Sequence, residues 1–455
     1  MNTLQSILFA SIMLVTTNAF ATSPPDSIST IVDRAAAALL VEEARTLYQE
    51  GKVRDALIKF RQAGVKDPYS WKPPYWISRC HYKMNNYGLS LKYALEAKST
   101  GKDKVNDEIH WMLGTVYHRL GNIDTAIIHY DKSIELLSKR RVKELRIEHK
   151  KAEAEYAKEA LENGAESIRT RLPGLVNSGY DDYNVVILEG GTSMYFTSRR
   201  SNTTGGQLNP DDQQYFEDIY LAKYDSDFNE WGELSNELGK LNSDGFDAIN
   251  YVSTAGDYAV ITLNTTATEE KVETKGSDIC ELKLNKKGTW NTPKIIKNKS
   301  INTSFFEGSA TLTADGNRMF FVTDRKGDKS STDIYMVQKD GKSWGEAAPL
   351  PMTINTTGRE TTPYITPDGK YLFFSSDGHL GMGGLDVYVA EYKGDGNWGE
   401  PVNLGPTVNT VNNDTHFVYA KDLGKGFISG YEVVGKKASI DIYEIDLSNF
   451  EIPAE

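Results

Sequence analysis

The residue types that most often carry chemistry are present, but they do not form a known catalytic or metal-binding pattern. The chain has seven histidines, and they show no ligand pair beside a carboxylate. The patterns G-x-S-x-G, H-E-x-x-H, a Walker-type Gly-Lys-Ser/Thr loop and a G-x-G-x-x-G between strand and helix are all missing from the sequence. We therefore expect no catalytic residue, no metal and no cofactor, and we look for function in binding.

Aspartates at regular spacing are the strongest candidates for an acid-base or metal site. Each begins a short apolar triplet, and successive triplets are 60, 55, 53 and 55 residues apart. Five equivalent residues in successive copies of one unit cannot all serve one centre, so we interpret them as structural, bonding to backbone near turns. The triplets begin at Asp218, Asp278, Asp333, Asp386 and Asp441.

Two insertions without counterparts in the other units are better binding candidates, because binding residues concentrate on loops. They are Arg199 to Glu217 and Asn264 to Gly276. The first is acidic, yet the spacing of its carboxylates matches no standard calcium loop.

Length and composition limit what kind of protein must position these residues. At 455 residues, 39% hydrophobic and 25% charged, the chain has the composition of a soluble globular protein of two or three domains. Residues 1–171 carry 26 Lys+Arg and 21 Asp+Glu, net +5, whereas residues 172–455 carry 25 and 42, net −17. The acidic half would repel phosphate backbones, so we expect no nucleic-acid partner. Two cysteines, Cys80 and Cys280, predict buried thiols and no disulfide framework.

The first 21 residues have the features of a secretory signal peptide. An apolar run of about a dozen residues is too short to span a bilayer, and small residues precede an expected cleavage site before Thr22. The residues before the run contain no Lys or Arg, whereas signal peptides usually begin with a positively charged region. We expect an exported chain without a membrane span, with 22–34 as a linker.

Three segments that align at a shift of 35 residues indicate helical repeats over 35–138. Their shared positions hold a turn residue (Gly51, Asn86, Gly121), then a small or apolar residue (Ala56, Leu91, Ala126), then a large one (Phe60, Leu95, Tyr130). These residues resemble the tetratricopeptide repeat, although Arg79 stands at a position that is usually small. The resemblance implies an α-solenoid of about three repeats, in which the first helix of each pair lines a groove.

The resemblance also implies which residues line that groove. Their aromatic and cationic side chains suit an extended peptide that carries carboxylates; the alternative is that the tryptophans pack between repeats. The candidate partner-binding residues are Arg45, Tyr48, Gln49, Trp76, Lys83, Glu108, Trp111, Thr115, His118 and Arg119. The segment 139–165 is rich in strong helix formers and predicts one long charged helix that caps the solenoid and ends at Asn163-Gly164. Its basic start could dock on an acidic surface or simply face solvent.

Residues 170–449 contain five copies of a strand-rich unit of about 50 residues. A tryptophan follows four of the triplets, and an asparagine closes each of those four units (Asn242, Asn302, Asn355 and Asn409). The stretches PDGKYLFFSSD and GGLDVYV resemble the WD-repeat-like blades of TolB-type propellers. The last unit stops after its third strand. The segment Leu172 to Asn177, at the start of the propeller, resembles Leu350 to Asn355, so we expect this segment to complete the last unit. The fold class is thus a tetratricopeptide-like α-solenoid followed by a β-propeller of five blades, or six if one blade has degenerated; 450–455 is a tail.

The order of these parts resembles envelope proteins of Bacteroidetes, some of which serve type IX secretion and gliding; their OmpA-like domain is missing from this sequence. The resemblance implies a non-catalytic periplasmic scaffold whose groove and propeller face bind envelope proteins at the outer membrane. One alternative is a propeller module that binds a small ligand or glycan at its mouth. A hydrolase is the third, and it would need a Ser-His-Asp set assembled through space.

Overall fold

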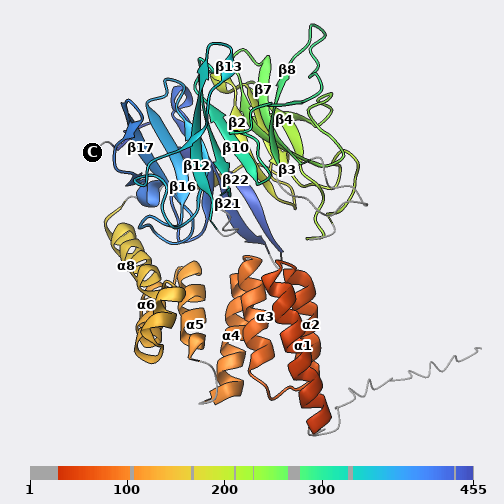
Figure 1. The fold of residues 1–455 in the computed structure, drawn as a ribbon, viewed down its shortest axis with the longest axis vertical. Helices are drawn as coiled ribbons and strands as arrows, with labels where there is room; N and C mark the ends of the chain where they lie inside the picture. The colour runs from red at the N-terminus through yellow and green to blue at the C-terminus, as the bar shows by residue number, and fades with distance from the viewer. Residues whose placement is uncertain are drawn as a thin grey trace, which may run out of the picture.

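The structure is a computed structural model that describes residues 29–102, 107–164, 169–209, 212–228, 230–264, 277–325, 331–434 and 437–453. The predicted signal peptide, most of the predicted linker and all but the first residue of the insertion Asn264 to Gly276 lie outside these residues. Figure 1 shows a helical half below a ring of small sheets. No helix among the described residues is long and apolar enough to cross a membrane.

The helical half consists of three helix hairpins and two further helices, as expected for a tetratricopeptide-like α-solenoid. The first helix begins at Ile31 inside the predicted linker, because Thr30 and Asp33 form a reciprocal capping box. The hairpins are α1 (Ile31–Gln49) with α2 (Val53–Lys66), α3 (Lys72–Lys83) with α4 (Tyr87–Gly101), and α5 (Glu108–Arg119) with α6 (Ile123–Leu136).

The second hairpin lies one residue away from the alignment that the sequence suggested. The backbone turns between paired helices are equivalent at Lys52, Asn86 and Asn122, each of whose N–H groups bonds to the carbonyl five residues earlier. The spacing is therefore 34 and then 36 residues. As a result Ser90 and Ala94 take the buried positions equivalent to Ala56 and Phe60, and the predicted Leu95 is exposed.

The segment after the hairpins bends. We expected one helix over 139–165, but it is interrupted at Arg146, whose backbone is left-handed (φ 52°). The result is α7 (Lys139–Glu144) and α8 (Ile147–Asn163), with Gly164 as the C-cap. The bend lets α8 pack against α6 instead of continuing away from it.

The second half is a five-blade propeller in which each blade is one small antiparallel sheet. The strand nearest the axis is a terminal strand of its sheet: β2, β6, β10, β15 and β20. The bounds are β1 (Arg169–Arg171), β2 (Asp182–Ile187), β3 (Ser193–Ser198), β4 (Asp218–Asp225), β5 (Glu230–Ser235), β6 (Phe246–Val252), β7 (Tyr258–Asn264), β8 (Asp278–Lys283), β9 (Lys294–Ile295), β10 (Glu307–Leu312), β11 (Arg318–Thr323), β12 (Asp333–Asp340), β13 (Ser343–Trp344), β14 (Ala348–Pro349), β15 (Glu360–Ile365), β16 (Tyr371–Ser376), β17 (Asp386–Gly394), β18 (Asn397–Trp398), β19 (Val402–Asn403), β20 (Asp414–Ala420), β21 (Lys425–Val434) and β22 (Lys437–Asp446).

The ring closes by pairing the start of the propeller with its end, as predicted. Strand β1 pairs with β22, and the Leu172 N–H bonds to the Ile442 carbonyl at 3.0 Å. Asn177 accepts from the Ile442 N–H at 2.7 Å and donates to the Ile442 carbonyl at 2.8 Å. Asn242, Asn302, Asn355 and Asn409 make the same two bonds in the other blades. Each asparagine thus acts as a side-chain clasp that extends the ladder by one residue.

Apolar side chains fill the space between every pair of neighbouring blades. One cluster joins the third and fourth blades and contains Phe320, Tyr388 and Trp398, with Phe320 and Trp398 edge to face at 5.7 Å. Similar clusters join the other four pairs, including the fifth and first blades. The tryptophans therefore pack between blades, as expected. Both cysteines are buried free thiols, which confirms that prediction.

A buried acid is the first or second residue of the innermost strand in every blade. In each case a Ser or Thr four residues earlier donates to it, as Ser243 does to Asp247. Three of the five acids also pair with an arginine: Asp182 with Arg200, Glu307 with Arg325, and Asp414 with Arg169. Asp247 has no ion pair with any described residue, and its Oδ1 has no hydrogen bond. Burial, reinforced by Asp218 and Glu217, raises the pKa of Asp247 to about 7.

We predict that Asp247→Asn changes how stability depends on pH. A carboxyl group with a folded pKa above its unfolded pKa of about 3.9 binds its proton more tightly in the folded state. Its contribution to the free energy of unfolding is therefore complete below about pH 3.9 and is lost as the pH rises to about 7. Between pH 5 and 8 this amounts to roughly 3 kcal/mol. Urea unfolding at both pH values should therefore show a loss in the wild type that Asp247→Asn lacks. Asp182→Asn, which breaks the pair with Arg200, should destabilise at both pH values. An equal pH dependence in wild type and Asp247→Asn would contradict the assignment.

Candidate functional site

The first helices α1, α3 and α5 form the surface that the repeat resemblance assigned to partner binding, here called the groove face. Tyr48 is buried, Trp76 and Trp111 are half-buried, and Gln49 and Lys83 are exposed. Trp76 packs edge to face with Tyr48 at 5.5 Å and stacks on Phe60 at 5.6 Å. The tryptophans therefore pack between helices and also leave part of their rings open, so both sequence interpretations describe them in part.

Arg79 is the central residue of the groove face, and the sequence interpretation missed it. Its guanidinium carbon lies 4.6 Å from the Trp76 ring centre and 5.3 Å from that of Trp111. The ring centres of Tyr48 and Tyr75 lie 5.4 and 5.9 Å from the same carbon. With the observed 34-residue spacing, the small position belongs to Ser78, which is fully buried. Arg79 then occupies the position equivalent to Arg45 and Thr115. The small residues Ser78, Ser90 and Ala94 could have revealed this one-residue shift in the alignment of the second repeat.

Positive charge on the groove face is only partly neutralised. Arg45 pairs with Glu42 at 2.9 Å and lies over Trp76, and Lys83 lies 4.7 Å from the Tyr48 ring centre. Within the described part of the chain, neither Arg79 nor Lys83 forms an ion pair with a carboxylate. Cations held against aromatic rings without an acidic partner favour a ligand that supplies carboxylates.

Glu108, the one acidic groove candidate, is occupied within the protein. It accepts from Arg141 of α7 at 2.6 Å and from the Tyr75 hydroxyl at 3.1 Å. The basic start of the capping segment thus docks partly on this carboxylate. Thr115 is buried and donates to the Trp111 carbonyl at 2.8 Å.

The last two groove candidates contact the propeller. His118 is buried, and its Nε2 donates to the Met382 carbonyl at 2.9 Å. Burial lowers the pKa of His118 to about 4, so the ring is neutral. Arg119 donates to the Val411 carbonyl at 2.8 Å and to the Tyr82 hydroxyl at 3.2 Å. These two side chains hold the two domains together.

A glycine-rich loop of the fourth blade makes this junction close. Met382 and Val411 belong to one apolar cluster with Tyr130, Ile147 and other residues of α6 and α8. A Cβ on Gly384 would overlap the Arg119 guanidinium, which leaves no room for a side chain. The helices and the propeller therefore share a continuous core, which fixes their relative orientation.

The insertion Arg199 to Glu217, where described, is tied to the first blade. Arg199 makes a bidentate pair with Asp212 at 2.7 and 3.0 Å. Glu217 is hydrogen-bonded to the Tyr183 hydroxyl at 2.6 Å. The two acidic side chains of the insertion that the structure describes, Asp212 and Glu217, are thus engaged internally.

The described residues contain no group of three or more His, Cys, Asp or Glu that could hold a metal ion. His110 and His129 face each other with Nδ1 atoms 2.9 Å apart, and His81 stacks on Tyr93. His379 bonds through Nε2 to the Ile354 carbonyl at 2.9 Å.

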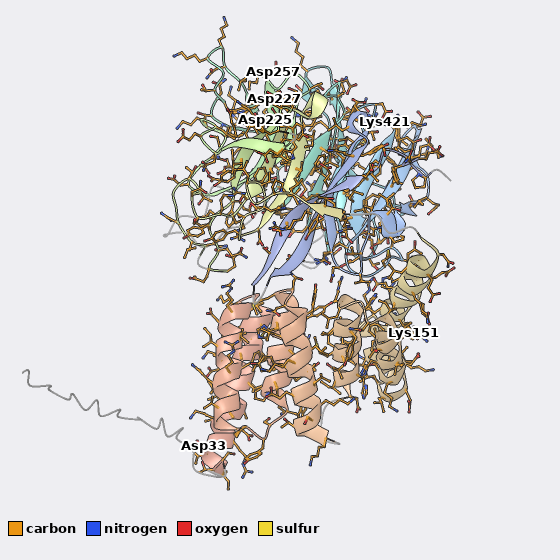
Figure 2. The ribbon with its side chains drawn as sticks, turned by 180° about the vertical axis from the view of Figure 1, so that it is seen from behind. Asp33, Lys151, Asp225, Asp227, Asp257 and Lys421 are labelled. Carbon is orange, nitrogen blue, oxygen red and sulfur yellow. The ribbon has the colours of Figure 1, made fainter. Side chains whose placement is uncertain are left out.

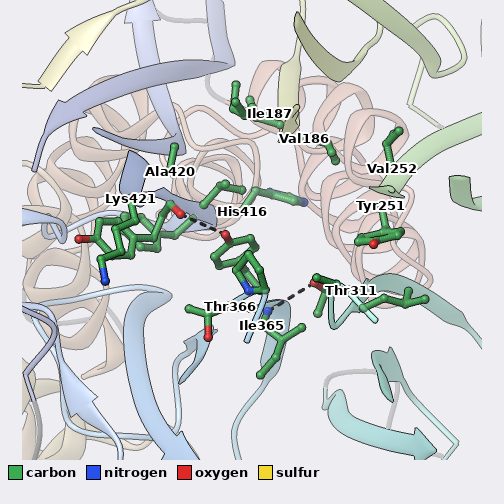
Figure 3. Close-up of a pocket in the computed structure, with 18 of the residues that line it drawn as sticks. Val186, Ile187, Tyr251, Val252, Thr311, Ile365, Thr366, His416, Ala420 and Lys421 are labelled. Atoms are coloured by element: carbon green, nitrogen blue, oxygen red, sulfur yellow. Dashed lines mark hydrogen bonds between the residues drawn. The ribbon is translucent and has the colours of Figure 1, made fainter. Parts of the chain in front are cut away.

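A second candidate surface is a cavity on the propeller axis. It is lined by the innermost strand of every blade, and Figure 3 shows the helices behind it. Its mouth therefore opens on the face away from the helical half. Lys421, at that mouth, and Asp225, Asp227 and Asp257 lie on the part of the propeller away from the helices in Figure 2.

Comparison with known proteins gives a limited result. No protein-family model matches the chain, and no curated protein matches it. Among solved structures, the first TPR of Spaghetti (RPAP3) bound to the HSP90 peptide SRMEEVD is 18% identical, covering 25% of this chain and 93% of that one, with a TM-score of 0.23. The type III secretion chaperone SycD of Yersinia enterocolitica, in complex with a peptide of the translocator YopD, is 20% identical over 29% and 99%, with a TM-score of 0.26. The N-terminal domain of stress-induced protein-1 from C. elegans is 13% identical over 26% and 99%, with a TM-score of 0.23. The repeat assignment for this chain therefore depends on its own helix hairpins.

Proposed function

We propose that this protein is a non-catalytic scaffold that binds an acidic segment of a partner protein on its groove face and a second protein on the open face of its propeller. The observation that carries the proposal is Arg79, held among four aromatic rings without a carboxylate partner in the described chain. A carboxylate that enters this site gains a charge-assisted hydrogen bond and meets a preordered side chain.

The fixed junction between the two halves supports the scaffold function. Two binding surfaces on one rigid body keep their partners at a constant distance and angle, which a flexible tandem of domains does not do. The shared core around Met382 and the bonds from His118 and Arg119 provide that rigidity.

We further propose that the scaffold is exported and works in the cell envelope, in the periplasm or attached peripherally to the outer membrane. The apolar N-terminal run followed by small residues supports export. The resemblance in domain order to Bacteroidetes envelope proteins is the basis for a link to outer-membrane or type IX secretion assemblies. Partners would then be envelope proteins.

We predict that Arg79→Glu weakens partner binding on the groove face at least tenfold. The substitution removes the attraction between Arg79 and the carboxylates of the partner. It also places a like charge beside those carboxylates, which costs up to several kcal/mol. Pull-down from cross-linked envelope fractions identifies a groove partner, and titration of its purified segment measures affinity. Arg54→Glu, an exposed site on α2, is the matched control and should leave affinity unchanged.

Binding on the groove face should also weaken as salt rises, because exposed charges are screened over about 10 Å at 0.1 M. Recovery of the same partners by Arg79→Glu and wild type, with equal affinity for their purified segments, would remove the groove from the proposal. Loss of partners only when the propeller is deleted would assign binding to the propeller alone.

A further inference from the structure

The cavity on the propeller axis has the size of a small-molecule site. Its volume is about 600 Å³, within the range of roughly 300–1,000 Å³ that is usual for ligand pockets. All five blades contribute to it through β2, β6, β10, β15 and β20. Because the innermost strands surround one axis, residues on them can all reach a single ligand, whereas the triplet aspartates lie on strands farther from the axis.

A bulge interrupts each of these five strands, one residue later in β6 than in the other four when counted from the buried acid. The ladder register shifts after Tyr183, Ile249, Gly308, Thr361 and Thr415. Four of the bulges hold a residue other than glycine in the left-handed region: Asn184 (φ 60°), Ser309 (φ 48°), Thr362 (φ 46°) and His416 (φ 53°). Such conformations are unfavourable for side-chain-bearing residues and concentrate at binding and active sites. Bulges of this kind redirect side chains and release backbone groups from the ladder.

The bulge residues form a polar ring, one from each blade, that we call the bulge ring: Asn184, Asn250, Ser309, Thr362 and His416. All five line the cavity. The side chains of Asn184, Asn250 and Thr362 also bond within the protein, to the Ile249 carbonyl, the Thr262 hydroxyl and the Ser375 hydroxyl. None is a carboxylate, a lysine or an arginine. Burial lowers the pKa of His416 to about 4, so its imidazole is neutral near pH 7. Its Nδ1 lies 3.1 Å from the Thr415 hydroxyl, and Nε2 bonds to no residue in the described chain.

The inner strands add further hydrogen-bonding capacity. Each of the five is the terminal strand of its sheet and pairs with one neighbour only, so one backbone edge faces the axis. Some of these edge groups bond to side chains of the neighbouring blade, as the N–H groups of Asn184, Ile249 and Ile365 do to hydroxyl groups. Edge groups without such a bond need a partner from water or a ligand.

Above the bulge ring the wall of the cavity is mainly apolar. Val186, Val252, Ile365 and Ala420 line it together with Tyr251, and Figure 3 shows these side chains around one opening. The charged residues among the lining are Asp368, Lys421 and Asp422, which are exposed and lie on turns at the mouth. A charged ligand that reached the bulge ring would therefore lose hydration without gaining an opposite charge.

We propose that the propeller cavity binds an uncharged small molecule whose apolar body contacts the wall and whose hydrogen-bonding end reaches the bulge ring. The apolar wall favours an aliphatic or aromatic body over a bare sugar, whose many hydroxyls would remain unpaired there. This site is independent of the groove face and lies on the opposite side of the propeller from the helices.

The neutral fluorophore N-phenyl-1-naphthylamine tests the proposal, because it combines an aromatic body with one N–H donor. Titration into the full chain should give a saturable fluorescence increase with one site per chain. The anionic analogue 1-anilinonaphthalene-8-sulfonate should bind at least tenfold more weakly.

Two substitutions locate the probe. Val186→Trp fills the cavity and should weaken binding at least tenfold; Ser309→Asn, which tolerates the left-handed backbone, narrows the bulge ring and should weaken it about threefold or more. Val65→Trp, on an exposed part of α2, is the matched control and should bind as wild type does. Circular dichroism checks that each variant is folded. Unchanged affinity in Ser309→Asn and Val186→Trp, equal affinity for the anionic analogue, or no saturable binding to the folded wild type would overturn the proposal.

Discussion

Replacing Asn177 with alanine should lower the free energy of unfolding of the propeller by about 3 kcal/mol. The side chain is buried and makes three hydrogen bonds, to both backbone groups of Ile442 and to the Leu172 carbonyl at 3.0 Å. Alanine leaves these buried groups unpaired at the seam of the ring, where the first and last strands of the propeller meet. Urea unfolding followed by tryptophan fluorescence measures the loss.

Asn355→Ala is the matched control, because Asn355 makes the same three bonds within the third blade, to Ile334 and Leu350. Both variants should lose similar stability. Only Asn177→Ala should also speed proteolysis in the segment 169–177, because the closing strand is held to residues about 265 positions away and separates once released. Equal cleavage of the two variants would show that the clasp does not hold the seam.

Replacing Arg119 with methionine should uncouple the helical half from the propeller. The substitution keeps the length of the side chain but leaves the Val411 carbonyl without its donor. It also removes a cation near the buried Glu153. Although burial opposes ionisation, Lys150, His149 and Arg119 hold the pKa of Glu153 below its ordinary value. Loss of one partner from such a buried set typically costs about 3–5 kcal/mol.

Calorimetry provides the measurement. The wild type should unfold in one transition, because the halves share a core, whereas Arg119→Met should give two. Arg45→Met, which removes a half-exposed pair with Glu42, is the matched control and should cost less than about 1 kcal/mol while keeping one transition. A single, unshifted transition in Arg119→Met would show that the apolar contacts of Met382 suffice to join the halves.

Much of the fold could be predicted from the sequence because its signals are local and repeated. The blades, the inter-blade tryptophans and the closing segment follow from patterns about 55 residues apart, and each copy supports the others. The strand that closes the ring, Arg169–Arg171, begins three residues before the predicted Leu172 but lies in the predicted blade.

The remaining features depend on contacts that no local pattern encodes. A one-residue difference in the spacing of α3 and α4 hid Arg79, because the predicted alignment placed it among small residues. The bond from His118 to Met382 joins residues 264 positions apart, so the sequence assigned His118 to a groove. The bulge ring could not be predicted because Asn, Ser, Thr and His do not indicate a left-handed backbone as glycine does. The break at Arg146, between α7 and α8, likewise follows from the packing of α8 on α6.

The closing strand β1 is the first propeller strand after α8 in the chain, so any tension applied to the helices would pull on the seam of the ring. The Met382 loop and the Arg119 bond provide a second path for that force, into the fourth blade. A load shared between the seam and an intact blade is less able to peel the closing strand away from β22. The junction thus suits the propeller to remain closed when the helical half is under mechanical strain.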